Sequence, residues 1–125
     1  MANVTLMALA DHGGADFGPA VDCSAYSRLL LDLACTNAAG PYWYLQVLLE
    51  HGPDPNGLNW RPLKELGNFS PRSAFPIRIV VNEFDAWVRV RFHAIAWDPR
   101  GTTAGPNAGT PPPVGLVWSL TGTGN

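Results

Sequence analysis

Charged residues are scarce in this 125-residue chain. Lysine, arginine, aspartate and glutamate make up 14% of it, against about 25% in an average soluble domain. Lys64 is the only lysine beside seven arginines, and the formal net charge is −2. This slightly acidic balance argues against a nucleic-acid-binding protein, which usually has a basic excess. The hydrophobic content of 46% in turn excludes an intrinsically disordered chain.

Long apolar runs and paired cysteines are also missing. No run approaches the ~18–20 residues of a membrane helix, so we expect no membrane association. The apolar stretch at residues 4–10 is short and follows no basic residue, so it predicts a β-strand and not a signal peptide. Cys23 and Cys35 flank a segment that we expect to span roughly 25–30 Å, whereas a disulfide needs Cα atoms within about 7 Å. We therefore expect two free thiols, which suits synthesis in a reducing cytosol.

Alternation of apolar and polar residues is the dominant pattern that is present. It is clearest at residues 86–97, where Val88, Val90, Phe92 and Ala94 share one face. No stretch of ten residues has the period of a helix. Strands are expected at residues 3–9, 28–34, 42–50, 59–66, 76–82, 86–97 and 114–120. About seven to eight strands predict an all-β fold, an antiparallel β-sandwich or jelly roll, as one domain over residues 1–125.

Glycine and proline mark the connections between these strands. Residues 37–41 carry turn chemistry, and the connection at 51–57 ends in Asn56-Gly57, a strong hairpin signal. The short polar segment at 82–85 predicts a hairpin joining the strands on either side. Residues 10–24 and 98–113 do not fit as strands and are expected to be irregular. The second, long loop contains Pro111, Pro112 and Pro113, whose extended conformation loses little entropy on binding a partner.

Signatures of catalysis are missing. The chain has no phosphate-binding loop and no GxSxG motif. Glu83 and Asp85 share one short connection and are expected to be solvated, unlike a glycosidase pair facing across a cleft. Asp54, Asn56 and Glu65 have an EF-hand-like spacing, but the glycine and flanking helices of that motif are missing. The three histidines, His12, His51 and His93, lie in separate segments. We predict no catalytic residue, no metal and no cofactor.

The aromatic residues are the remaining candidates for function. Of five tryptophans, Trp43 and Trp118 fall on predicted inward faces and are expected in the core. Trp87 and Trp97 share the opposite face of their strand with several cationic side chains. That face is either solvated, with arginine stems lying over rings, or a contact surface, because Trp, Tyr and Arg dominate interface energies. The candidate partner-binding residues are Trp87, Arg89, Arg91, His93, Trp97, Arg100, Pro111, Pro112 and Pro113.

Several short sequences occur in a characteristic order. Val21-Asp22, followed by Tyr26, leads into the strand at 28–33. The strand ending in Glu50-His51-Gly52-Pro53-Asp54 is followed by Asn56-Gly57 and Trp60. Val88-Arg89-Val90-Arg91 and a C-terminal strand at 117–122 complete the series. Over residues 20–97 and 114–122, this order resembles small β-sandwich virion proteins of tailed bacteriophages.

The resemblance implies a head decoration (cement) protein with no catalytic residues. Its expected partner is the major capsid protein, its expected state a homo-oligomer with a trimer favoured, and its expected location the capsid surface after synthesis in the bacterial cytoplasm. One alternative is a carbohydrate-binding module with Trp87, Trp97, Trp60 or Tyr42 as a stacking platform. Another is a head–tail joining or tail component that forms a ring. The scarcity of charge predicts that other chains bury much of the outer surface.

Overall fold

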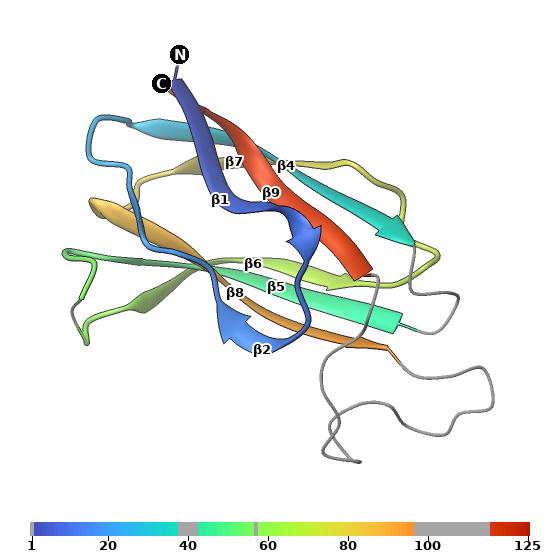
Figure 1. The fold of residues 1–125 in the computed structure, drawn as a ribbon. Helices are drawn as coiled ribbons and strands as arrows, with labels where there is room; N and C mark the ends of the chain where they lie inside the picture. The colour runs from blue at the N-terminus through green and yellow to red at the C-terminus, as the bar shows by residue number, and fades with distance from the viewer. Residues whose placement is uncertain (1, 38–42, 57, 97–115) are drawn as a thin grey trace.

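Two antiparallel β-sheets pack face to face in the computed structural model, which describes residues 2–37, 43–56, 58–96 and 116–125 (Figure 1). The four-stranded sheet has the order β1 (Ala2–Asp11), β9 (Leu116–Gly124), β4 (Arg28–Asn37) and β7 (Ile77–Asn82). The five-stranded sheet has the order β2 (Gly14–Phe17), β8 (Trp87–Ala96), β5 (Trp43–Gly52) and β6 (Arg61–Phe69), and β3 (Val21–Asp22) also pairs with β8. The predicted all-β sandwich is confirmed.

The chain changes sheets at almost every connection. Among the described strands, β5 and β6 form a hairpin within one sheet, as the Asn56-Gly57 signal predicts. By contrast the connections β1–β2, β3–β4, β4–β5, β6–β7, β7–β8 and β8–β9 each pass from one sheet to the other. Repeated crossing between two four-stranded layers is the topology of a jelly roll. The short β3 is an addition to that plan.

Period-2 alternation builds the core from both sheets. Leu29, Leu31 and Leu33 of β4 are fully buried, and so are Val88, Val90 and Ala94 of β8. Trp43 and Trp118 are 3% and 0% exposed, so their predicted core positions are confirmed. Ring contacts fill the centre, where Phe92 packs edge-on against Trp118 with ring centroids 5.1 Å apart. Strand spacing is tight as well, since a Cβ on Gly122 of β9 would lie 1.8 Å from the Leu30 carbonyl oxygen.

The predicted hairpin at residues 82–85 is wrong. β7 pairs with β4 in one sheet, while β8 pairs with β2, β3 and β5 in the other, so this connection crosses the sandwich. Glu83 adopts a positive φ of 59° in the crossing, a conformation that is uncommon outside glycine. The alternation did not predict this crossing, because it indicates only that each strand has one face toward the core. A crossover satisfies that condition as well as a hairpin does.

The expectation that residues 10–24 are irregular is also wrong in part. The segment contains the end of β1 and all of β2 and β3. Ala15, Asp16 and Phe17 of β2 are all exposed, so the strand carries no apolar alternation for a sequence pattern to reveal. Main-chain pairing with Phe92 and its neighbours on β8 holds it in place. The irregular loop predicted at 98–113 and the turn residues 38–41 lie outside the described residues.

The two cysteines are free thiols. Burial raises the pKa of the Cys23 thiol to about 11, with the Asp22 carboxylate adding to the effect, and burial raises the pKa of the Cys35 thiol to about 11. Ser24 donates hydrogen bonds to Asp22 from its hydroxyl and its main chain, and these lower the pKa of that carboxyl. Thiols with a raised pKa carry little thiolate near neutral pH and are poor nucleophiles.

Candidate partner-binding surface

The outer face of the five-stranded sheet gathers most of the described polar and aromatic side chains singled out above. Trp87, Arg89, Arg91 and His93 alternate along β8 with residues that point into the core. The register of β5 and β8 places Glu50 opposite Arg89, Leu48 opposite Arg91 and Gln46 opposite His93. Directly opposed side chains on one face of a sheet lie close enough to interact. Strand pairing therefore assembles this face from two distant parts of the sequence.

Glu50 of β5 is a buried anion on this face, opposite Arg89 of β8. It is 6% exposed, and its Oε1 accepts a hydrogen bond from Arg89 Nε at 2.9 Å. Arg91 Nη1 lies 3.8 Å from its other carboxylate oxygen. A carboxylate so far removed from water is stable only when it is paired. The sequence did not indicate the role of Glu50, because it does not show which residue of β8 lies opposite Glu50.

The Arg89 guanidinium lies between two aromatic rings. It is 3.9 Å from the ring centroid of Phe17 on β2 and 4.3 Å from that of Trp60, which precedes β6. Attraction between a cation and a ring face adds to the ion pair with Glu50. An arginine over aromatic rings was one of the two interpretations of this face. The rings are Phe17 and Trp60, however, whereas the sequence pattern indicated Trp87 and Trp97.

A trough runs over the middle of the same face, with a volume of about 480 Å³. Its lining comes from four strands and combines apolar and polar groups: Ala15, Gln46, Leu48, Pro62, Glu65, Arg91, Phe92 and His93. The side chain of Arg91 is 59% exposed. The His93 ring is held by Tyr44, whose hydroxyl lies 3.3 Å from Nδ1. A concavity of this size and mixed chemistry can accept part of another molecule.

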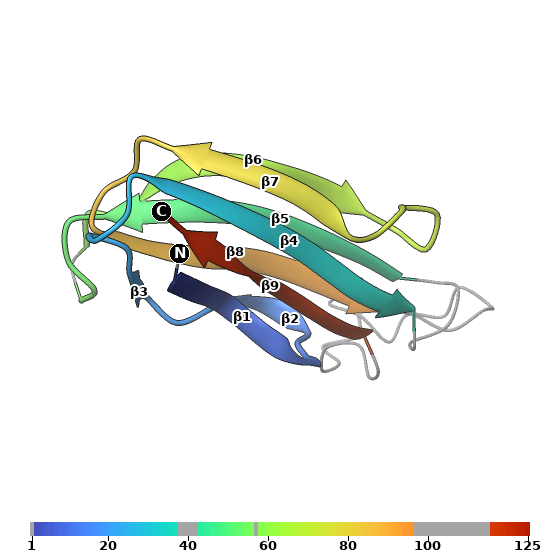
Figure 2. The same cartoon turned by 90° about the horizontal axis from the view of Figure 1, so that it is seen from above.

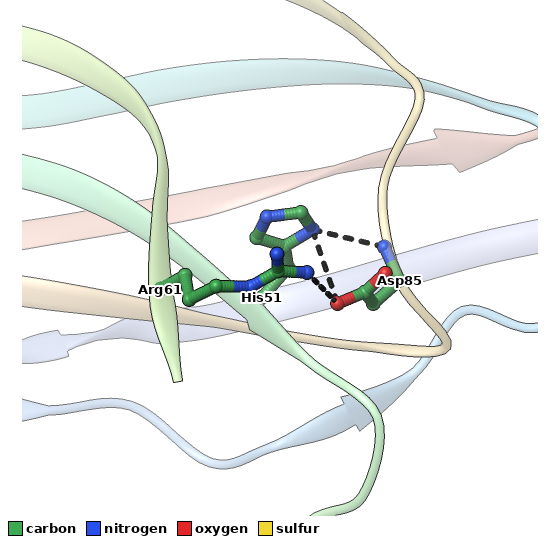
Figure 3. A network of polar contacts seen from close by, with 3 residues as sticks. All are labelled: His51, Arg61 and Asp85. Carbon is green, nitrogen blue, oxygen red and sulfur yellow. Dashed lines mark hydrogen bonds and ion pairs between the residues drawn. The ribbon is translucent and has the colours of Figure 1, made fainter. Parts of the chain in front are cut away.

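A second polar network fastens the connection between β7 and β8 to the end of this face (Figure 3). The Asp85 main-chain N–H donates to His51 Nδ1 at 2.9 Å. The Asp85 carboxylate accepts from Arg61 Nη2 at 2.6 Å and lies 3.8 Å from His51 Nδ1. Because Nδ1 accepts a hydrogen bond, it carries no proton in this arrangement. Asp85 was expected to be solvated, but it links β5, β6 and the crossing connection.

The structure brings together only part of the predicted site. Arg89, Arg91 and His93 share the face with half-buried Trp87. Arg89 is occupied by Glu50 and two rings, whereas Arg91 and His93 line the trough. Trp97, Arg100, Pro111, Pro112 and Pro113 lie outside the described residues. Gln46, Leu48 and Glu65 belong to the trough but were not among the predicted partner-binding residues, because their β-strand neighbours depend on register.

Within the described residues, no group of three or more His, Cys, Asp or Glu side chains could hold a metal ion, and no helix has the length and apolarity to cross a membrane. No protein-family model, no curated protein and no solved structure matches this chain.

Proposed function

We propose that this protein is a non-enzymatic structural protein of a phage virion, a decoration protein that binds the head shell and stabilises it. The outer face of the five-stranded sheet carries the proposal. It presents arginine and aromatic side chains beside a trough of about 480 Å³. Such residues supply most of the binding energy in protein interfaces. The jelly-roll topology is compatible with this role, since viral coat proteins are among the proteins that use it, but a fold alone does not define a function.

Rigidity of the face supports binding to a large partner. Arg89 is held by a carboxylate and two rings, and His93 by Tyr44, so these side chains lose little freedom on association. The exposed Arg91 and the trough are left to contact the partner. The expected partner is the major capsid protein. Binding only to the assembled shell would stabilise the shell over free subunits by mass action, and repeated copies would add avidity.

The test compares head shells with and without the protein. Shells of the virus that encodes it are stripped, recombined with purified protein and heated while their integrity is followed by light scattering. We expect decorated shells to rupture at a higher temperature. Gln46→Arg, which fills the trough, should weaken binding about tenfold or more. The matched control Thr121→Arg adds the same charge on the other sheet and should bind normally. Equal rupture temperatures, or equal binding by both variants, would refute the proposal.

A carbohydrate-binding module is the second candidate, and the polar lining of the trough favours it. Gln46, Glu65 and Arg91 can exchange hydrogen bonds with sugar hydroxyls. The stacking platform expected for sugars is less evident, because the guanidinium of Arg89 lies over the Trp60 ring. An array of immobilised glycans tests this function. Specific binding that is lost in Gln46→Ala and Trp87→Ala would support it, and absence of binding to every glycan would exclude it for the sugars tested.

A further inference from the structure

The two long sides of the sandwich carry opposite charge. β1 and β2 run along one side, and β6 and β7 run along the other (Figure 2). The strands β1 and β2 contain no lysine or arginine, and the first side bears the carboxylates of Asp11 and Asp16. Residues 61–82 bear Arg61, Lys64, Arg72 and Arg78 against the single acid Glu65. We call these the acidic edge (residues 8–17) and the basic edge (residues 61–82).

The acidic edge is also unusually apolar for an exposed strand edge. Residues 8–11 at the end of β1 are all exposed, and so are Ala15, Asp16 and Phe17 of β2. Leu9 is 63% exposed and Phe17 is 45% exposed. Within the described residues β1 pairs only with β9, and β2 only with β8. A free, apolar strand edge is a surface on which another strand pairs.

Contacts to the core hold this edge in a fixed shape. The His12 main-chain oxygen accepts a hydrogen bond from the indole N–H of buried Trp118 at 2.9 Å. The His12 ring packs edge-on against the same indole, with centroids 5.4 Å apart, and its Nε2 contacts the Ala8 main-chain oxygen. The exposed strands on either side of His12 are therefore preorganised. A surface that is already ordered loses less entropy when it binds.

The basic edge supplies the complementary features. Among the described strands, β7 pairs with β4 alone, and Val80 on it is 38% exposed. Lys64 of β6 reaches across to the Val80 carbonyl oxygen at 3.4 Å, which places its charge at this edge. The side chains of Arg61 and Arg78 pair with Asp85 and Asp32 but remain 63% and 78% exposed. A guanidinium has five N–H donors, so each can still meet a second carboxylate.

We propose that the acidic edge of one copy docks on the basic edge of a second copy, with β1 lying beside β7 so that the four-stranded sheet continues from copy to copy. A like-with-like contact between two acidic edges is disfavoured, because it would oppose carboxylates. Contact between two different edges is head-to-tail, and such contacts close into a ring when the rotation between copies allows it. Self-association needs no shell and can therefore be measured on the purified protein, although the two edges share Ala15, Pro62 and Glu65 with the trough.

Sedimentation equilibrium of the purified wild-type protein is the first test. We expect a mass that is a multiple of 13.4 kDa at low salt and that falls toward the monomer at about 1 M salt, where charges are screened. Leu9→Ser, at a largely exposed position, should weaken association without unfolding the chain. A wild-type protein that stays monomeric up to the highest soluble concentration would overturn the proposal.

Charge reversal tests which edges meet. Asp16→Lys and Lys64→Glu should each raise the dissociation constant about tenfold or more, because each puts like charges in contact. The chain with both reversals should associate again, since its edges are complementary with exchanged signs. Asp54→Lys is the matched control, because it makes the same charge change as Asp16→Lys at an exposed site in the β5–β6 connection, outside both edges. Circular dichroism confirms folding. If Lys64→Glu associates with the wild-type dissociation constant, or if the double variant associates no more tightly than the single variants, these edges do not meet.

Discussion

The outer faces of the two sheets use the same chemical pair in different surroundings. On the five-stranded sheet, Arg89 and Glu50 meet at 2.9 Å with side chains only 20% and 8% exposed. On the four-stranded sheet, Arg78 and Asp32 meet at 3.2 Å with side chains 78% and 41% exposed. Burial makes the first pair obligatory, because either partner alone would leave a charge out of water. The second pair is solvated and screened, so neither partner depends on the other.

The difference shows that the outer face of the five-stranded sheet is the more highly ordered of the two. The five-stranded face holds its cation with two rings and is hollowed by the trough, whereas the ion pair described on the four-stranded face joins two solvent-exposed side chains. Buried charge on a face that could have been apolar is expensive to maintain. That cost is consistent with a binding role for the five-stranded face.

The largest expected effect follows from Glu50→Gln. The substitution preserves shape but leaves the Arg89 guanidinium between Phe17 and Trp60 without its anion. We expect the free energy of unfolding in urea to fall by about 3 kcal/mol. The double variant Glu50→Leu/Arg89→Met should cost less than the sum of its single changes, because no unpaired charge remains. Additive costs would mean that the two side chains do not depend on each other.

The next effect concerns the thiols, which lie outside the five-stranded face and titrate without ion-pair partners. An unfolded thiol ionises at its usual pKa of 9.0, whereas burial raises the pKa of Cys23 to about 11. Between these values the unfolded chain loses the proton and the folded chain keeps it, so the free energy of unfolding falls as pH rises from 9 to 11. The loss should approach about 2 kcal/mol at pH 11.

The pH series is measured by urea unfolding and compared with that of Cys23→Ala, because burial also raises the pKa of Cys35 to about 11 and both thiols ionise in this range. The variant should be less stable at pH 7 but should lose less stability on going to pH 11. Parallel pH profiles of the two proteins would contradict the expected burial of this thiol.

A smaller effect is expected from the aromatic contact with Arg89. Trp60→Leu removes one of the two rings over the guanidinium and should cost about 1 kcal/mol beyond the lost packing. The same change in an Arg89→Met background isolates the cation–ring contact, because both backgrounds lose the same ring. Trp87→Leu is the matched control. Trp87 lies on β8 and, like Trp60, is half-buried. Equal costs of Trp60→Leu in both backgrounds would exclude a contribution from the contact.

The sequence pattern predicted the layers of this molecule better than its site. Alternation identifies which residues of β4, β5 and β8 enter the core, because burial of one face acts on each strand separately. It says nothing of which strands are neighbours. Arg89 and Glu50 are therefore recognisable as partners only after β5 and β8 are paired. Phe17 escaped notice for a similar reason, since β2 is held by its main chain and not by an apolar pattern.

The smallest expected effect is that of Asp32→Asn on the four-stranded face. The substitution removes the carboxylate that accepts from Arg78 Nε at 3.2 Å, but both side chains are open to water. Water replaces the lost interaction, so the free energy of unfolding should change by less than about 0.5 kcal/mol. Raising the salt concentration should shrink even this difference, whereas the cost of Glu50→Gln should persist because its surroundings exclude ions. If burial separates the faces, urea unfolding of the two variants at low and high salt will show a cost that shrinks with salt for Asp32→Asn and one that does not change for Glu50→Gln. A large, salt-resistant cost for Asp32→Asn would mean that the four-stranded face depends on its ion pair as strongly as the other.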